Sequence, residues 1–400
     1  MATDPADPVP SRSLRIAHLT TVDMSLALLL ATELEADVAA GHEVFGISAV
    51  GPYVPRIEAR GVTHVPVASL TRSWDPRRDL EACLELFRTI RGLHLDVLHT
   101  HNPKTGAMGR VAGRLAGVPV VVNTCHGLWA RPEDRWRKRA FVYVLEALAI
   151  RFSHYELFQN AEDLATLRPV LKRGRYRLVG NGVDLTRFGP DPEGRRRVRA
   201  ELGVADDEIL VGTIGRRVRE KGLVEFADAA TRLAGRARFV WIGPEDDTDP
   251  EAHQAAASAG PHGDAVQYVD ERTDMPAVYS ALDVFVLASY REGFSRASME
   301  AAACGVPMVL TDIRGCREIG RHEEHLLLVP PKSREALADG IERLIDDPRL
   351  RALLGAAARR RALVEFDQRR VANASLSTYA AVPAGKGGIR RRRRGDAVHR

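Results

Sequence analysis

Short apolar runs alternate with helical patterns along most of this chain. In the first half, runs of strand length fall at residues 14–19, 42–48, 63–67, 96–100, 119–124 and 154–159. Helical patterns fill residues 24–40, 76–92, 104–116 and 132–152 between them. The run at 119–124 is almost wholly apolar, which is typical of a parallel strand covered on both faces. This succession predicts a doubly wound parallel sheet.

A second series of the same kind follows a break in the pattern. Residues 184–207 contain Pro190, Pro192, Gly194 and several arginines, which predicts a linker with a charged helix. Strand-like runs then fall at 208–215, 237–243, 265–269, 283–289, 306–311 and 325–329, and helical patterns at 333–346, 348–364 and 367–381. The chain therefore belongs to the α/β class, with two domains of similar size.

The pattern also predicts the boundaries of these parts. They are a disordered leader at 1–13, an N-terminal domain at 14–183, the linker at 184–207, a C-terminal domain at 208–364, a helix at 365–383 that crosses back to the N-terminal domain, and a basic disordered tail at 384–400. Ligands of open parallel sheets bind outside the carboxyl ends of the strands, so chemistry is expected just after strands.

Composition and charge narrow the classes of function. A length of 400 residues suits two domains, and 45% apolar with 28% charged residues is typical of a soluble globular protein. The net charge is +5, but residues 384–400 alone carry seven cationic side chains and one aspartate. The rest of the chain is nearly neutral. A nucleic-acid-binding fold would carry a basic face on its body, so we expect no nucleic-acid partner.

Targeting signals and cysteines favour a cytoplasmic location. The four cysteines form no C-x-x-C pair and are too few for a disulfide framework. Residues 1–13 are acidic and proline-rich, whereas a signal peptide is basic and then apolar. The most apolar stretch, 24–40, contains Glu33, Glu35 and Asp37 and so does not predict a membrane span.

Two segments after predicted strands suit an anionic ligand and a sugar. In GTIGRRVREKG (212–222), Arg216 and Lys221 lie beside a predicted helix start, where backbone N–H groups favour a diphosphate. Taken alone, the segment is explained slightly better as a solvated basic loop with a glycine at the helix start. In 283–307, Glu292 lies in a loop after a strand, and Glu300 lies one turn into a predicted helix of 297–304. Two carboxylates beside free helix amides suit sugar hydroxyls, whereas a favourable acidic helix start explains only the first.

These two segments, each following a predicted strand and occurring in this order along the chain, resemble those of the retaining nucleotide-sugar glycosyltransferases of family 4. The resemblance covers roughly 14–382 and implies the GT-B fold, two Rossmann-like domains facing a cleft. It rests on Glu-x(7)-Glu at Glu292 and Glu300, and on G-R-x(4)-K-G at 215–222. NGVDLTRF (181–188) also looks like the family, and TDIRGCRE (311–318) is similar to bacterial members that build surface glycans. One departure is HLTTVDMSLALL (18–29), which lacks the Gly-Gly loop of many members.

The resemblance implies a role for each matched residue. Arg216 and Lys221 would bind the donor diphosphate, and Glu300 the ribose hydroxyls of the nucleotide. Glu292 would hold the donor sugar, together with the backbone amides of Gly293, Phe294 and Ser295. His126, in NTCHG (123–127), matches the histidine that reaches the donor sugar across the cleft. Taken alone, a histidine after a strand is more simply a turn residue bonded to backbone.

The segment HTHNPKTG (99–106) offers a metal site or a cleft wall. His99 and His101 have a spacing possible for metal ligands, but no third ligand is near in sequence. The family usually needs no metal, so we expect no metal and no cofactor. His101 and Lys104 are instead expected at a wall that touches the acceptor, with Lys104 near a phosphate of a lipid-linked acceptor.

Two basic segments are candidates for contact with the inner face of an anionic membrane. Residues 129–152 combine clustered cations and two tryptophans with an apolar helical run, and the arginine tail is the second candidate. An ordinary core-facing helix and a solvated tail explain them equally well.

We therefore expect a retaining transferase that moves a hexose-type unit from a nucleoside diphosphate sugar, with UDP as the expected nucleotide. The expected acceptor is a lipid-linked intermediate in surface polysaccharide synthesis, and the alternative is a small secondary metabolite. A GT-B nucleotide-sugar 2-epimerase would lack the Glu-x(7)-Glu pattern. The intact set of predicted site residues opposes a mere binding protein, and the neutral body opposes an RNA binder acting through its tail.

Overall fold

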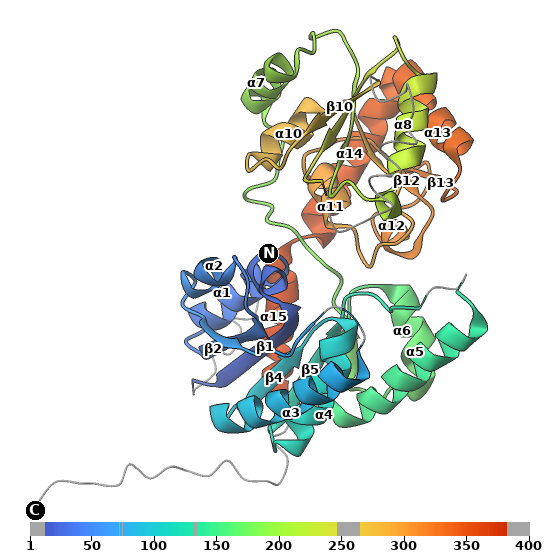
Figure 1. Ribbon diagram of the computed structural model, residues 1–400. Helices are drawn as coiled ribbons and strands as arrows, with labels where there is room; N and C mark the ends of the chain where they lie inside the picture. Colours follow the sequence, from blue (N-terminus) through green and yellow to red (C-terminus); the bar gives the residue numbers. More distant parts are fainter. Residues whose placement is uncertain (1–12, 72, 74, 131–133, 246–264, 382–400) are drawn as a thin grey trace, which may run out of the picture. The chain divides into compact units, whose positions relative to one another are not determined.

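The structure of the chain is a computed structural model that describes residues 13–71, 73, 75–130, 134–245 and 265–381 (Figure 1). The chain divides into two compact units. The first unit comprises Met1–Leu157, Leu167–Arg177 and Ala372–Arg400, and the second comprises Phe158–Thr166 and Leu178–Val371. Each unit is built around one β-sheet.

The sheet of the first unit has the strand order β3-β2-β1-β4-β5-β6-β7. Strands β1 to β5 pair in parallel, and their order is that of a doubly wound fold. The strands span Arg15–Val22 (β1), Glu43–Ala49 (β2), Thr63–Pro66 (β3), Val97–Thr100 (β4), Val120–Cys125 (β5), Tyr155–Phe158 (β6) and Tyr176–Leu178 (β7). The predicted parallel sheet is confirmed.

Small residues bring one helix of the first unit directly onto the sheet. A Cβ atom at Gly109 would lie 2.4 Å from the side chain of Leu19 in β1, and one at Gly113 would lie 2.6 Å from Leu98 in β4. Side chains at these two glycines would therefore push the helix α4 (Pro103–Leu115), which follows β4, away from the sheet. The helices of the first unit are α1 (Ala31–Ala39), α2 (Val54–Glu58), α3 (Pro76–Leu93), α4 (Pro103–Leu115), α5 (Trp136–Ala149) and the part of α15 (Gln368–Ala381) from Ala372 onward.

The second unit has a six-stranded parallel sheet in the order β10-β9-β8-β11-β12-β13. Neighbouring residues of β11 belong to different apolar clusters, since Phe285 packs in one and Val284 and Val286 in the other. Side chains alternate along a strand, so both faces of the sheet are covered. The strands are β8 (Leu210–Ile214), β9 (Arg238–Ile242), β10 (Val266–Val269), β11 (Val284–Leu287), β12 (Met308–Thr311) and β13 (Leu327–Val329).

The helices of the second unit surround that sheet (Figure 1). The charged helix predicted in the linker is α7, which packs against α10. The helices are α6 (Ala161–Leu167), all but its last residue, α7 (Pro192–Leu202), α8 (Leu223–Arg232), α10 (Met275–Ala281), α11 (Arg296–Ala303), α12 (Arg314–Arg317), α13 (Arg334–Asp346) and α14 (Pro348–Glu365).

The structure differs from the sequence predictions at several places. The helix predicted at 24–40 is interrupted, because a π-helical turn at Ser25–Leu29 precedes α1. The pattern also missed α2, α6 and β7. Residues 158–166, expected in the N-terminal domain, group with the second unit, because Asn160, Ala161 and Asp163 bond to that unit.

Some expectations fall beyond the described residues. The predicted leader, apart from residue 13, and the basic tail at 384–400 lie outside them, as do residues 131–133 of the predicted basic segment. Within the described part of the chain, none of the helices combines the length and hydropathy needed to span a bilayer.

Candidate functional site

Two glycines shape the loop that carries the predicted diphosphate ligands. Gly215 directly follows β8 with φ +144°, and its carbonyl accepts a 2.8 Å hydrogen bond from Nε1 of Trp241. Gly222 has φ +80°, and a Cβ there would lie 2.3 Å from the carbonyl oxygen of Ala288. Only glycine fits this contact. The close approach brings Lys221 beside the loop that follows β11.

Lys221 and Glu292 form an ion pair at this edge of the sheet. Nζ of Lys221 lies 2.6 Å from Oε1 of Glu292, and Ser289 donates a 2.9 Å hydrogen bond to the same oxygen. The side chains are 26% and 15% exposed, so water still reaches both charges. A Cβ at Gly315 would lie 2.7 Å from the carbonyl oxygen of Glu292, so TDIRGCRE packs closely against this loop. The pair offers a cation and an anion side by side.

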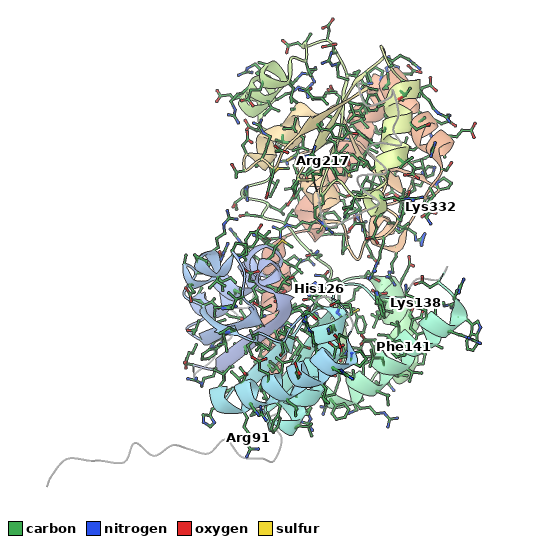
Figure 2. The ribbon with its side chains drawn as sticks, in the orientation of Figure 1. Arg91, His126, Lys138, Phe141, Arg217 and Lys332 are labelled. Carbon is green, nitrogen blue, oxygen red and sulfur yellow. The ribbon has the colours of Figure 1, made fainter. Side chains whose placement is uncertain are left out.

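The other cations of the loop differ in their surroundings. Arg216 is exposed at the end of β8, close in sequence to Lys221. Arg217, labelled in Figure 2, forms a 2.8 Å ion pair with Asp270. Its guanidinium also packs over the ring of Tyr268. Arg217 is therefore engaged with β10 and its following loop, and we do not assign it to the site.

The helix α11 begins where the sequence predicts, directly after the Gly-Phe-Ser turn. Ser295 is its N-cap, and its hydroxyl accepts a 3.2 Å hydrogen bond from the amide of Ser298. The ring of Phe294 packs edge-on against the ring of Phe366, with the ring centroids 5.8 Å apart, and this contact holds the turn in place. The predicted sugar-binding segment Gly293, Phe294 and Ser295 thus leads directly into the N-terminus of α11, with Ser295 as the N-cap. The first backbone N–H groups of a helix lack intrahelical partners.

Glu300 lies one turn into α11 and is held at both oxygens. Its Oε2 accepts a 2.9 Å hydrogen bond from the hydroxyl of Tyr279, and its Oε1 accepts a 3.2 Å bond from Nε of Arg296. Burial raises the pKa of the carboxyl, while Arg296 and Tyr279 act in the opposite direction. Tyr279 is completely buried, and burial together with Glu300 holds its pKa well above 10. Glu300 is therefore fixed in orientation.

Sequence reasoning missed several residues that shape this site. Asn160 donates a 3.3 Å hydrogen bond to the carbonyl of Gly293, and buried Asp163 forms an ion pair with Arg314. The amide of Ala161 donates to Glu318 at 2.7 Å. The two segments involved are more than 100 residues apart, so no local pattern signals their contact. The segment 311–318 stood out only through the family resemblance.

The first unit contains the other predicted site residues. His126 directly follows β5, and its Nε2 lies 2.9 Å from Nδ1 of completely buried His101. Lys104 lies in the first turn of α4 and is only 5% exposed. Its ammonium pairs with Asp79 and donates to the carbonyls of Thr71 at 3.1 Å and Ser73 at 2.6 Å. The direct contact of Lys104 with an acceptor phosphate stays a prediction, and this burial does not favour it.

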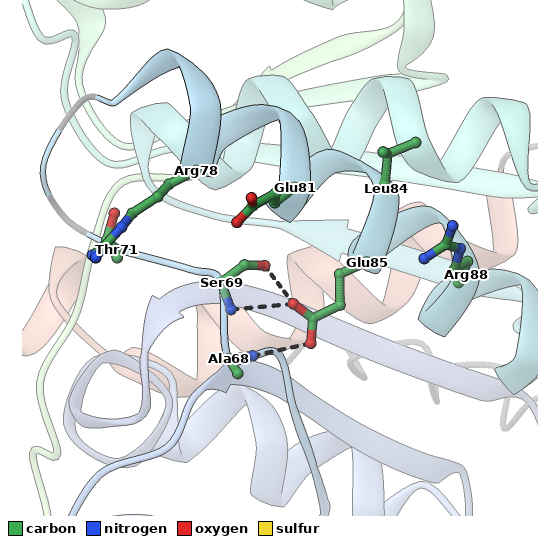
Figure 3. Close-up of a pocket in the computed structure, with 8 residues that line it drawn as sticks. All are labelled: Ala68, Ser69, Thr71, Arg78, Glu81, Leu84, Glu85 and Arg88. Carbon is green, nitrogen blue, oxygen red and sulfur yellow. Dashed lines mark hydrogen bonds between the residues drawn. The ribbon is translucent and has the colours of Figure 1, made fainter.

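A separate hollow of about 630 Å³ lies in the first unit between residues 68–71 and α3 (Figure 3). Glu85 on its wall accepts hydrogen bonds from the amides of Ala68 and Ser69, each 3.1 Å long. These bonds fix the segment to the helix. None of the predicted site residues lines the hollow. We therefore assign no ligand to it.

Family models match both halves of the chain. The model described as glycosyl transferases group 1 matches residues 194–361, and the model described as glycosyl transferase 4-like domain matches residues 27–182. The first match contains Arg216, Lys221, Glu292 and Glu300, and the second contains His126.

Curated relatives and solved structures agree with these models. N,N'-diacetylbacillosaminyl-diphospho-undecaprenol alpha-1,3-N-acetylgalactosaminyltransferase of Campylobacter jejuni is 28% identical over 349 residues, 85% of this chain and 91% of that protein. Lipopolysaccharide core biosynthesis mannosyltransferase LpsB of Rhizobium meliloti is 30% identical over 266 residues, 56% of this chain and 74% of that protein. Anabaena HepE in complex with UDP matches with a TM-score of 0.76 at 20% identity, covering 92% of this chain and all of that one. The likeness to this structure shows the GT-B fold, and the chain belongs to the group 1 glycosyltransferases.

Proposed function

We propose that this glycosyltransferase moves a sugar, with retained anomeric configuration, from a UDP-sugar to a lipid-linked glycan intermediate of surface polysaccharide synthesis. One observation carries this proposal. Glu292 lies in the loop before α11 and forms an ion pair with Lys221 from the loop after β8, and fixed Glu300 follows one turn into α11. Cation, sugar-binding carboxylate and ribose-binding carboxylate thus occur together in the second unit.

The proposed reaction breaks one bond at the anomeric carbon and forms another on the same face of the sugar. The bond from that carbon to the diphosphate oxygen breaks as the acceptor oxygen attacks. The acceptor proton passes to the leaving phosphate. Arg216 and Lys221 stabilise the charge that develops on the diphosphate, which is where fixed cations lower a barrier most. Because these side chains supply the positive charge, the mechanism needs no resident metal.

The carboxylates and the histidine bind the donor in this proposal. Glu300 accepts hydrogen bonds from the ribose hydroxyls, and its two existing partners support that role because they fix its oxygens. Glu292 holds the donor sugar together with the N-terminal turn of α11. His126 contacts the donor sugar, as the resemblance to the family implies. Glu292 is a binding and orienting group, not a covalent nucleophile.

The relatives support the choice of donor and acceptor. The Campylobacter jejuni protein is named for an undecaprenol diphosphate acceptor, and Anabaena HepE was solved with UDP.

A panel of donors and acceptors tests the proposal. Purified protein is incubated with UDP-, GDP-, ADP- and dTDP-sugars, with and without a polyprenyl-diphosphate-linked sugar, and products are identified by mass spectrometry. We expect UDP release that requires the lipid-linked acceptor, survives EDTA and is lost in Glu300→Ala. Release of another nucleotide would contradict the UDP-sugar donor. Transfer only to soluble aglycones would contradict the lipid-linked acceptor, and loss of activity with EDTA would contradict a mechanism without a metal. Isomerisation of the donor without release would indicate an epimerase.

We also propose that α5 rests on the anionic inner face of a membrane, where a lipid-linked acceptor resides. Phe141, Val144 and Leu148 are 56%, 59% and 54% exposed and follow one another at helical spacing (Figure 2). Exposed Arg137 and Arg151 lie at the two ends of this stripe. An apolar stripe flanked by cations suits the interface of an anionic bilayer.

Vesicle sedimentation tests the membrane contact. We expect the protein to bind vesicles rich in phosphatidylglycerol, and Phe141→Asp with Leu148→Asp to weaken binding by about tenfold or more. The matched control is Leu353→Asp with Leu363→Asp on α14, because these leucines are 59% and 50% exposed in the second unit. Equal loss in both double variants, or equal binding to neutral phosphatidylcholine vesicles, would refute the contact.

A further inference from the structure

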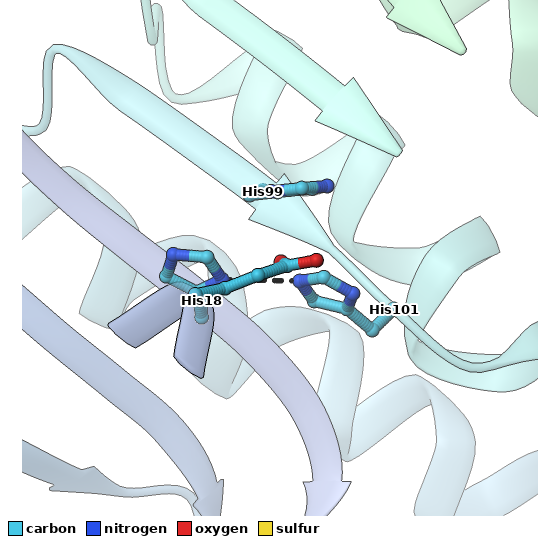
Figure 4. A group of neighbouring side chains, drawn as sticks. His18, His99 and His101 are labelled. Carbon is cyan, nitrogen blue, oxygen red and sulfur yellow. Dashed lines mark hydrogen bonds between the residues drawn. The ribbon is translucent and has the colours of Figure 1, made fainter. Parts of the chain in front are cut away.

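Four histidines gather at the carboxyl ends of neighbouring strands in the first unit. Figure 4 shows three of them, His18, His99 and His101. His18 of β1 and His99 of β4 are directly paired in the sheet, and His101 follows β4. His126 follows β5, the next strand across. His18, His99 and His101 have no exposed surface, whereas His126 is partly exposed. The sheet order therefore brings together side chains that are far apart in sequence.

Three of these rings form one hydrogen-bonded chain that ends on a carboxylate. Oδ2 of Asp37 lies 2.7 Å from Nε2 of His18. Nδ1 of His18 lies 3.1 Å from Nε2 of His101, and Nδ1 of His101 lies 2.9 Å from Nε2 of His126. Asp37, on α1, is 1% exposed. The chain thus runs from a buried carboxylate to the partly exposed histidine of the predicted donor site.

The carboxylate gives this chain a direction. An ionised carboxylate only accepts hydrogen bonds, so Nε2 of His18 carries a proton. With a neutral His18, Nδ1 of that ring accepts from Nε2 of His101, and Nδ1 of the neutral His101 ring accepts from Nε2 of His126. Burial lowers the pKa of His101 well below its ordinary value, which keeps that ring neutral. The unprotonated nitrogen of His126 is then Nδ1.

We propose that Asp37, His18 and His101 are positioning residues that hold His126 as a neutral ring protonated on Nε2. The consequence for catalysis rests on the proposed function. A neutral ring adds no positive charge beside a sugar that becomes cationic as its bond to the diphosphate breaks. In other enzymes a wrong histidine tautomer lowers catalysis even when the geometry is intact.

Two neighbours lie beside the chain without being part of it. His99 has its own partners, the hydroxyls of Tyr379 and Thr124, each at 2.7 Å. Hydroxyls both donate and accept, so they impose no tautomer. The carboxyl of Glu33 is 7% exposed, and burial raises its pKa to about 7. Glu33 is therefore mostly neutral below pH 7, and Asp37 is the carboxyl that contacts His18.

A metal ion would be the competing explanation for this cluster. Potential ligand atoms of His18, Glu33, His99 and His101 lie within 4.8 Å of one another. The ring nitrogens of the three histidines already have hydrogen-bond partners in the structure. A metal would have to break the contact between His18 and His101 and one contact of His99. The geometry therefore favours the hydrogen-bonded chain.

Nuclear magnetic resonance of protein labelled with ¹⁵N-histidine tests the proposal without any substrate. His126→Gln assigns the signals of His126. At pH 7 we expect a protonated Nε2 and an unprotonated Nδ1 in His126. Asp37→Asn removes the obligate acceptor, because an amide both donates and accepts, and so shifts His126 toward the Nδ1–H form. Tyr379→Phe removes a buried hydrogen bond of the cluster outside the chain and should leave His126 unchanged.

Kinetics of the same variants tests the consequence for catalysis. We expect Asp37→Asn to lower kcat by about tenfold with KM for the donor nearly unchanged, and Tyr379→Phe to change neither. An Nδ1–H or doubly protonated His126 in the wild type, unchanged His126 signals in Asp37→Asn, or one zinc ion per chain by elemental analysis would overturn the proposal. An unchanged kcat in Asp37→Asn would overturn its catalytic part. Expected signals in a protein that turns over no donor would instead refute the proposed function alone.

Discussion

The two units place polar groups at the carboxyl ends of parallel strands in opposite ways. In the second unit, Lys221 and Glu292 keep both charges as an ion pair that water still reaches. In the first unit, His18 and His101 have no exposed surface, and their rings are in hydrogen-bond contact with each other. Burying an isolated charge is costly, so a dry cluster favours neutral forms, whereas a wetter loop tolerates charge. The polar groups of the second unit can therefore stabilise charge on a ligand, whereas the buried histidines of the first unit fix which atoms donate and which accept hydrogen bonds.

Removing the cation of the second unit gives the largest expected effect. Lys221→Ala deletes the ammonium expected at the leaving diphosphate and leaves Glu292 without it, so we expect kcat to fall by about 10²–10³-fold. Steady-state rates of UDP release measure this. The control is Arg217→Ala, because Arg217 pairs with Asp270, whose side chain is 90% exposed, and such pairs contribute little. Equal losses in the two variants would show that charge anywhere in the loop suffices.

Neutralising a buried carboxyl in the first unit should change stability instead, and only at higher pH. The pKa of Glu33 is raised to about 7, mainly by burial, against 4.5 for the free group. The folded chain therefore holds this proton more tightly than the unfolded chain, and stability is lost as pH rises from 4.5 to 7. The full penalty above pH 7 is about 3 kcal/mol.

Urea unfolding of Glu33→Gln at pH 4.5 and pH 8 measures this penalty. The variant should match the wild type at pH 4.5 and be more stable at pH 8. Glu35→Gln is the control on the same helix, since Glu35 is 55% exposed and pairs with Arg60 at the surface. A gain in the free energy of unfolding that is the same at both pH values would contradict the raised pKa.

The smallest expected effect distinguishes two carboxylate–tyrosine pairs within the second unit. Glu300→Gln removes the charge offered to the ribose hydroxyls, so KM for the donor should rise about tenfold with little change in kcat. Glu225 is matched to it, as a buried carboxylate that accepts a 2.7 Å bond from Tyr290. Glu225→Gln should leave KM unchanged. A similar rise in both variants would indicate a structural role for Glu300.

Local signals predicted the parts of the site that lie within one strand, loop and helix. The helix expected at 297–304 is α11 at Arg296–Ala303, because the cap at Ser295 is local. The contact of Asn160 with Gly293 was not predictable, because it depends on tertiary packing over 133 residues. The spacing of His99 and His101 was visible, but their neighbours His18 and Glu33 come from β1 and α1 through the sheet order.

The division of the chain has a consequence for protein engineering. The backbone passes between the units four times, at residues 157–158, 166–167, 177–178 and 371–372. A chimera joined in the linker at 184–207 would therefore replace residues 158–166 of the second unit along with the first unit. It would give Arg314 and Glu318 a foreign partner in place of the segment that holds Asp163 and Ala161. Functional hybrids of this enzyme should need residues 158–166 transplanted together with the second unit.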